Sequence, residues 1–225
     1  MNVSVFKLAE IIQAELVGNP HKIVEQVFYD SRNIITPENG VFFAISAIHD
    51  GHTFMEEAYQ KSIRIFVCTH IPNEHEDATY LIVKNPVQAL QKWAEHHLSN
   101  YTIPTIGITG SNGKTIVKEW LYQCLWEQYN IVRSPKSFNS QIGLPLSVLQ
   151  TNKENNLGIF EVGISQPGEM VKQEQVLHPS IGVLTNVLSA HSEYFKDKSH
   201  QISEKIKLFK NSETIIYNNE NEEVE

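Results

Sequence analysis

The sequence has little cysteine, no long hydrophobic run and no excess of basic residues. Its 225 residues include two cysteines, Cys68 and Cys124. Both lie in apolar surroundings without CxxC spacing, so we expect buried, reduced thiols. The apolar runs are far shorter than the roughly 20 residues of a membrane span, and the N-terminus is typical of an amphipathic helix rather than a signal peptide. We therefore expect a cytoplasmic protein with no membrane span.

Basic residues are outnumbered, with 18 Lys and Arg against 26 Asp and Glu, for a net charge of −8. This balance argues against a general nucleic-acid binder, which normally carries a basic face. It leaves an anionic substrate open, because a local cluster of lysines can hold phosphate whatever the total charge. The remaining composition, 41% hydrophobic and 20% charged, is that of an ordinary globular protein.

The first 98 residues show short helical and strand patterns. Ser4 is a suitable N-cap for a helix that carries apolar residues through Leu16 and stops near Gly18. Strand-like runs cover residues 24–28, 41–45, 63–68 and 80–83, and helical patterns cover residues 52–61 and 87–98. His49 and His52 flank Asp50, which we interpret as a helix-entry cap rather than a metal site. We predict a small N-terminal α/β domain over residues 1–98.

The polar stretch 99–104 is the predicted domain boundary, and a regular alternation follows it. Strand-like runs lie at residues 105–109, 130–133, 157–162, 181–187 and 214–217, separated by helical segments that are clearest at 114–129 and 202–209. Strands that alternate with helices indicate a parallel sheet covered on both faces. The three tryptophans (Trp93, Trp120 and Trp126) fall on helices at core-compatible spacing. The acidic tail directly follows a strand, so we expect domain 99–225 to be truncated.

The segment 105–115, TIGITGSNGKT, carries the strongest functional signal. It places an apolar strand before a Gly/Ser/Asn loop and a long helix after it, which is the context that a phosphate loop requires. Backbone N–H groups of residues 109–115 and the positive end of the helix would hold phosphates. Lys114 would reach the β- and γ-phosphates, and the Thr115 hydroxyl would bind Mg²⁺. The sequence therefore predicts ATP and Mg²⁺ as cofactors.

One position departs from the general pattern GxxxxGK[ST]. Its first glycine would stand at Ile108, and Gly107 and Gly110 flank that position instead. The alternative interpretation is a glycine-rich turn with an incidental lysine.

The string TGSNGKT resembles the phosphate loop of the Mur ligases, ATP-dependent ligases that build the peptidoglycan stem peptide. Further segments resemble the same family, namely residues 30–32 (DSR), 40–44 (GVFFA), 50–52 (DGH) and 137–145 (SFNSQIGLP). The resemblance implies a parallel-sheet ATP-binding domain after a UDP-MurNAc-binding domain over residues 1–98, with a C-terminal domain absent from this chain. It also implies that Asp30, Ser31 and Arg32 contact the uridine nucleotide, and that Asn139 lies near the phosphates. A surface ion pair is the alternative for Arg32.

Three features resemble the family member that adds D-alanyl-D-alanine. They are the glycine after Glu161-Val, a later Gly168-Glu169 pair, and Thr185-Asn186. Leu188-Ser189 replaces a usual Gly-Glu. The string RSPKSFNSQIGLPLSV is similar to the ligase half of those members that are fused to an alanine racemase. The substrates so implied are UDP-MurNAc-tripeptide and D-Ala-D-Ala.

The same resemblance implies the catalytic residues. Glu161 and His191 would hold Mg²⁺ with Thr115, at the strand ends where open α/β sheets bind ligands. Lys205 matches a lysine that these ligases carbamylate, although lysines on a helix are often only solvated. With Lys114, these residues would form an acyl phosphate and join the dipeptide to it.

Two other classes stay open: another ligase of Mur or folylpolyglutamate type, and a non-catalytic nucleotide-binding module. We expect this chain alone to bind nucleotide weakly and to have little ligase activity.

Overall fold

The computed structural model describes residues 2–46, 49–186 and 194–219. The chain divides into two compact units, Met1–Trp93 and Ala94–Glu225. This division falls within helix α3 (Pro86–Leu98), and the boundary expected after residue 98, at the end of the same helix, stays a prediction. Within the described ranges, no helix combines the length and apolar character that crossing a membrane would require.

The first unit is built on a mixed five-stranded sheet. Its strand order is β2 (Glu15–Val17), β7 (Thr79–Ile82), β6 (Ile65–Cys68), β5 (Gly40–Phe43) and β4 (Gln26–Phe28). Strand β2 runs antiparallel to β7, and the other pairs are parallel. Strands β1 (Val3–Ser4) and β3 (Ile23–Val24) form a separate antiparallel pair. The helical elements are α1 (Val5–Ile12), η1 (Ser31–Asn33), η2 (Gly51–Phe54) and α2 (Met55–Gln60).

Two capping residues set the ends of helical elements in this unit. Ser4 Oγ accepts a hydrogen bond from the Lys7 amide at the start of α1. The Asp50 side chain accepts one from the His52 amide at the start of η2. Both predicted caps are therefore confirmed. The expectation that α1 extends through Leu16 is wrong. Gln13 adopts a left-handed conformation, with φ of 56°, and this ends the helix and lets Leu16 join strand β2.

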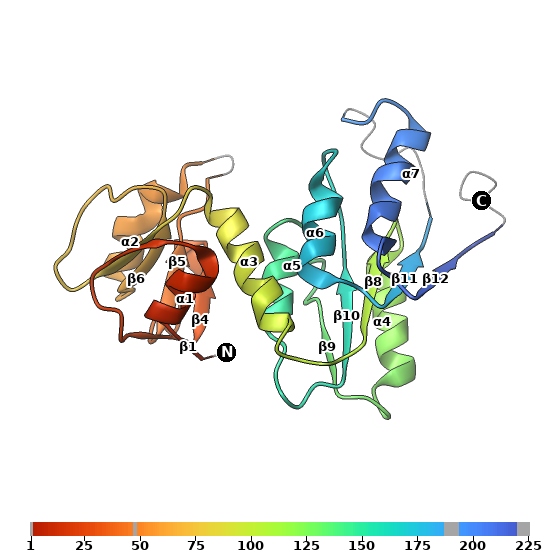
Figure 1. The fold of residues 1–225 in the computed structure, drawn as a ribbon, viewed down its shortest axis with the longest axis horizontal. Coiled ribbons are helices and arrows are strands. Elements are labelled where there is room, and N and C mark those ends of the chain that lie inside the picture. The colour runs from red at the N-terminus through yellow and green to blue at the C-terminus, as the bar shows by residue number, and fades with distance from the viewer. Residues whose placement is uncertain (1, 47–48, 187–193, 220–225) are drawn as a thin grey trace. The chain divides into compact units, whose positions relative to one another are not determined.

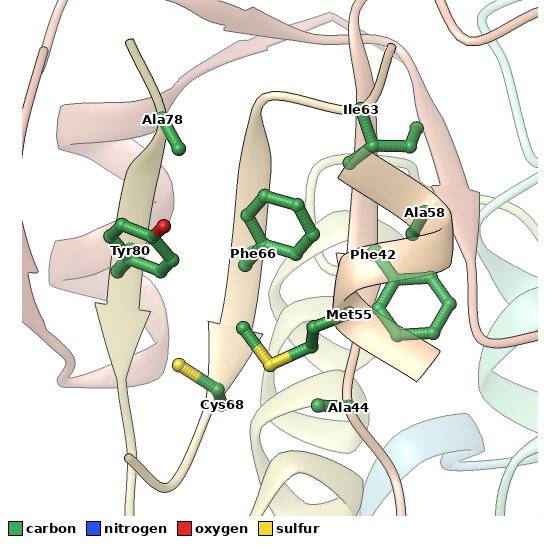
Figure 2. Close-up of a cluster of buried hydrophobic side chains, with 9 residues drawn as sticks. All are labelled: Phe42, Ala44, Met55, Ala58, Ile63, Phe66, Cys68, Ala78 and Tyr80. Carbon is green, nitrogen blue, oxygen red and sulfur yellow. The ribbon is translucent and has the colours of Figure 1, made fainter. Parts of the chain in front are cut away.

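The core of the first unit lies between α2 and the sheet (Figure 2). Met55 and Ala58 of α2 belong to one buried cluster with Phe42, Phe66 and Tyr80 of three neighbouring strands. Cys68 is also fully buried there, as expected, and burial raises the pKa of its thiol to about 11. Burial of these large aromatic side chains therefore contributes to the stability of this unit.

The second unit is built on a five-stranded sheet that is parallel throughout. Its order is β12 (Thr214–Tyr217), β11 (Ile181–Leu184), β8 (Thr105–Thr109), β10 (Leu157–Glu161) and β9 (Ile131–Arg133). The helices are α4 (Lys114–Leu125), α5 (Gly143–Val148), α6 (Glu169–Leu177), α7 (Lys198–Ile206) and η3 (Lys207–Phe209). Figure 1 shows these helices flanking the strands. The α/β class expected for both parts of the chain is confirmed.

Helices cover both faces of this sheet. On one face, Val117 and Leu121 of α4 pack against Ile106 and Ile108 of β8. On the other, Gly182 of β11 lets Phe209 approach so closely that an added Cβ would lie 2.3 Å from its ring. The inner strands β8, β10 and β11 are therefore covered on both sides, which explains their continuous apolar sequences, whereas the edge strand β12 is exposed along its length.

Three side chains expected in the interior lie on the surface of the second unit. Trp120 is 64% exposed and Trp126 is 55% exposed, and Cys124 is also exposed, whereas Trp93 is buried as expected. The sheet-facing stripe of α4 is formed by Val117, Leu121 and Leu125, and the two tryptophans fall outside it. The spacing of apolar residues predicted a helix here, but it did not show which aromatic residues face the sheet.

We predict that Phe66→Ala lowers the free energy of unfolding by about 3–5 kcal/mol, because it leaves a cavity in the cluster of the first unit. Urea denaturation followed by circular dichroism measures the change. Ile35→Ala is the matched control, since Ile35 is 87% exposed and should change stability by no more than about 0.5 kcal/mol. Similar midpoints for the two variants would contradict this description of the core.

Candidate active site

The loop between β8 and α4 depends on two glycines. Gly110 has φ of +142° and Gly113 has φ of +82°, a region that other residues rarely adopt. A Cβ at Gly110 would also lie 2.1 Å from Thr185 Oγ1. Gly113 is the N-cap of α4, so Lys114 and Thr115 begin the helix with amide groups that no preceding helical turn can pair. The strand–loop–helix order expected from the sequence is confirmed.

The end of β11 holds this loop in place. Asn186 O accepts a hydrogen bond from the Ser111 amide at 2.8 Å, and Asn186 Oδ1 accepts one from the Asn112 amide at 2.9 Å. Thr185 Oγ1 donates to Asn112 O at 2.6 Å. Sequence reasoning used Thr185 and Asn186 only as a family signature and missed this role. Two loop amides that were expected to bind phosphate therefore serve to fix the loop.

The Lys114 side chain lies over the same loop. Its Nζ donates to Gly110 O at 2.8 Å and to Ser111 O at 3.2 Å. Burial lowers the pKa of this amine, while the negative charge of Glu161 opposes the shift. The ammonium is therefore held by carbonyl groups of the loop, and its contact with phosphate stays a prediction.

Thr115 and Glu161 meet beside the start of α4. Glu161 ends strand β10, which pairs in parallel with β8 and aligns Glu161 with Ile108. Its side chain is fully buried, and its Oε2 accepts a hydrogen bond from Thr115 Oγ1 at 3.1 Å. Ser137 Oγ lies 3.2 Å from the same hydroxyl. The structure thus brings together two of the three expected Mg²⁺ ligands.

The oxygen donors at this point fit a magnesium ion. Glu161 Oε1 is buried, and among the described residues it makes no contact with hydrogen-bond geometry, although Lys118 Nζ lies 3.0 Å away. A carboxylate with an unused lone pair beside a hydroxyl is the kind of site that Mg²⁺ prefers. The third expected ligand, His191, lies outside the described residues.

A polar pocket of about 320 Å³ opens next to the loop. Its lining includes Lys114, Asn139, Glu169 and Lys205. Lys205 Nζ donates to Ser111 Oγ at 2.9 Å, and the residue is only 5% exposed. Burial, helped by the charge of Lys114, lowers the pKa of Lys205 to about 8. Two lysines therefore face a space beside the loop that could hold an anionic group.

Asp30, Ser31 and Arg32 belong to the first unit. Arg32 is highly exposed and forms an ion pair with Asp30, at 2.8 Å between Nη2 and Oδ2. This contact holds the pKa of Asp30 below its usual value. Ser31 is buried and donates to Glu57 Oε2 at 2.7 Å. The surface ion pair considered for Arg32 is present, and a role of these residues in substrate binding stays a prediction.

The fold and this loop define the second unit as a parallel α/β domain of the phosphate-loop class. The sequence of residues 108–225 matches the Mur ligase middle domain. The chain belongs to the Mur ligase family.

Two curated relatives share one name. The chain is 32% identical over 218 residues to the UDP-N-acetylmuramoyl-tripeptide–D-alanyl-D-alanine ligase of Borreliella burgdorferi, covering 92% of this chain and 47% of that protein. It is 29% identical over 192 residues to the Bacillus subtilis enzyme of the same name, covering 84% and 41%. The chain therefore spans about half the length of the curated relatives it matches.

Solved structures show the same fold. MurF from Acinetobacter baumannii superposes with a TM-score of 0.89 at 20% identity, covering 96% of this chain and 49% of that one. MurF from Thermotoga maritima, solved in complex with ADP, gives a TM-score of 0.79 at 27% identity, covering 89% and 47%.

We predict that Lys205 reacts with acetic anhydride with half-maximal rate near pH 8, because its pKa is lowered to about 8. Mass spectrometry of the acetylated peptide measures the profile. In the urea-unfolded chain, the same lysine should titrate near the ordinary value of about 10.4. Lys114→Met should move the folded-state midpoint upward, since it removes the second cause of the shift. A midpoint near 10 in the folded chain would contradict the burial of this amine.

Proposed function

We propose that the chain carries the nucleotide-binding part of an ATP-dependent ligase of MurF type. The observation that supports this most directly is the arrangement around one glycine-rich loop. Lys114 and Lys205 contact the loop and line the polar pocket beside it, and Thr115 meets Glu161 at the start of α4. The relatives at about 30% identity are named for the addition of D-alanyl-D-alanine to UDP-N-acetylmuramoyl-tripeptide. The reaction of the whole protein would be the same, with ADP and phosphate as the other products.

The proposed reaction begins with activation of a carboxylate. An oxygen of the tripeptide carboxylate attacks the γ-phosphorus of ATP, the bond to ADP breaks, and an acyl phosphate forms. The amine of D-Ala-D-Ala then attacks the acyl carbon, phosphate leaves, and the amine loses a proton. Charge builds on the transferring phosphoryl group, so stabilising that charge is the main task of the site.

Each residue at the loop has a distinct part in this proposal. Lys114 binds the β- and γ-phosphates, and the amides at the start of α4 face the same oxygens. Thr115 and Glu161 would hold Mg²⁺, with His191 as the third ligand. Bound Mg²⁺ neutralises phosphate charge and screens it from the incoming carboxylate.

Asn139 and Lys205 line the pocket in which the acyl group would lie. Asn139 O accepts from the Gly163 amide at 2.8 Å, which fixes the loop after β9 against the end of β10. Because the pKa of Lys205 is near 8, a sizeable neutral fraction is available near pH 8. That form can add to CO₂, forming a C–N bond and releasing a proton, as the carbamylated lysine of this family would require.

Asp30, Ser31 and Arg32 are the proposed contacts for the UDP moiety in the first unit. The domain boundary after residue 98 and the cytoplasmic location are part of the same proposal. Fusion to an alanine racemase stays a prediction.

We predict that Lys114→Ala weakens ADP·Mg²⁺ binding by about 10- to 150-fold, since a charge-assisted hydrogen bond contributes about 1.5–3 kcal/mol. Isothermal titration calorimetry of the 225-residue chain measures it. Lys153→Ala is the matched control, because Lys153 is an exposed lysine of the same unit. Unchanged affinity in Lys114→Ala would contradict the phosphate role.

The ligase activity is tested on a longer polypeptide that contains these 225 residues and is as long as the curated relatives. Phosphate release should require UDP-MurNAc-tripeptide and D-Ala-D-Ala together, and Lys114→Ala should abolish it while the circular dichroism spectrum is retained. Release with a different acceptor, such as a glutamate-extended folate, would favour another ligase class. Nucleotide binding without phosphate release on any acceptor would favour a non-catalytic module.

A further inference from the structure

Lys118 is a fully buried lysine on the sheet-facing side of α4. Its ammonium donates to Ser134 O at 2.8 Å and to Lys136 O, and it lies 3.0 Å from Glu161 Oε1. A buried ammonium is unfavourable unless partners replace its water. Two carbonyls accept hydrogen bonds from the Lys118 ammonium, and the Glu161 carboxylate compensates its charge as an ion pair.

The partners of Lys118 belong to the segment that leads into the candidate active site. Ser134 and Lys136 precede Ser137, whose Oγ lies 3.2 Å from Thr115 Oγ1. Lys136 has φ of +50°, an unusual conformation for a lysine. Ser134 Oγ also accepts a hydrogen bond from the Glu161 amide at 3.1 Å. One ammonium therefore links α4, the segment after β9 and the end of β10.

The charge of Lys118 bears on Glu161 directly. Glu161 is fully buried, and its two carboxylate oxygens have different neighbours. Oε2 accepts a hydrogen bond from Thr115, and Oε1 lies beside Lys118. Removing one member of a buried ion pair leaves the other uncompensated, which costs more than the pair contributes. Glu119, whose Oε1 lies 3.2 Å from Lys118, is partly exposed and also pairs with Arg133. Lys118 is thus placed to fix the orientation of the Glu161 carboxylate.

We propose that Lys118 is a positioning residue that holds Glu161 against Thr115 and thereby makes nucleotide binding respond to a divalent cation. This inference rests on the proposed function, because it assigns Glu161 to the cation that accompanies the nucleotide. Lys118 itself would contact neither the nucleotide nor the cation. Partners that orient metal ligands typically change metal affinity by about 10- to 100-fold when removed.

The test is ADP binding by the 225-residue chain, measured by calorimetry over a series of Mg²⁺ concentrations. In Lys118→Met, the affinity for ADP without Mg²⁺ should stay within about twofold, because the loop and Lys114 are intact. The Mg²⁺ concentration that gives half of the affinity gain should rise about 10- to 100-fold. Lys172→Met is the matched control, since Lys172 is an exposed lysine on α6, and it should behave as the unmodified chain.

Two results would overturn the inference while leaving the proposed function standing. One is an unchanged Mg²⁺ response in Lys118→Met. The other is an equal loss of ADP affinity with and without Mg²⁺, which would make Lys118 a general structural residue. If the unmodified chain bound no ADP·Mg²⁺, the proposed function would itself be contradicted and the role of Lys118 would fall with it.

A second variant covers the case in which Lys118→Met does not fold. The double variant Lys118→Met/Glu161→Gln removes both charges of the buried pair. Recovery of the folded circular dichroism spectrum in the double variant would support the inference, because the lysine would then be needed only when the carboxylate is present. Failure of the double variant to fold would contradict it.

Discussion

The hydrogen bonds between the phosphate loop and the end of β11 are the constraint on which the site depends. In this parallel sheet, β8 lies between β10 and β11, so the carboxyl ends of three strands meet at one edge. Thr185 and Asn186, which directly follow β11, fix the loop, and β10 provides Glu161 on the other side. Gly110 allows the close approach to Thr185 that this arrangement requires. The strand order thus determines which side chains lie beside the loop.

The local charge of the site differs from that of the chain. The chain carries a net charge of −8, yet Lys114, Lys118 and Lys205 are all largely buried near the start of α4, with Glu161 as a fully buried carboxylate among them. The pKa of Lys205 is lowered first by burial and then by the charge of Lys114, so the two ammonium groups repel each other. A polyanionic ligand would relieve that repulsion. This local excess of positive charge suits a nucleoside triphosphate.

The sequence predicted the parts of the fold that local patterns determine. The apolar strand 105–109, the glycines at 110 and 113 and the helix from Lys114 are all present, because turn chemistry and periodicity act within a few residues. Long-range contacts could not be predicted in the same way. No role was predicted for Lys118, although its place between Val117 and Leu121 of the apolar stripe was a signal that it is buried. The exposure of Trp120 depends likewise on which face of α4 meets the sheet, a choice that spacing alone left open.

The central claim is that the start of α4 binds the phosphates of a nucleotide, with Thr115 and Glu161 holding the accompanying Mg²⁺. A crystal structure of this chain with ADP and Mg²⁺ tests it most directly. We expect the β-phosphate at the amides of Lys114 and Thr115, and Mg²⁺ density beside Thr115 Oγ1, on the Glu161 side. Nucleotide bound elsewhere, or Mg²⁺ bound away from both side chains, would contradict it.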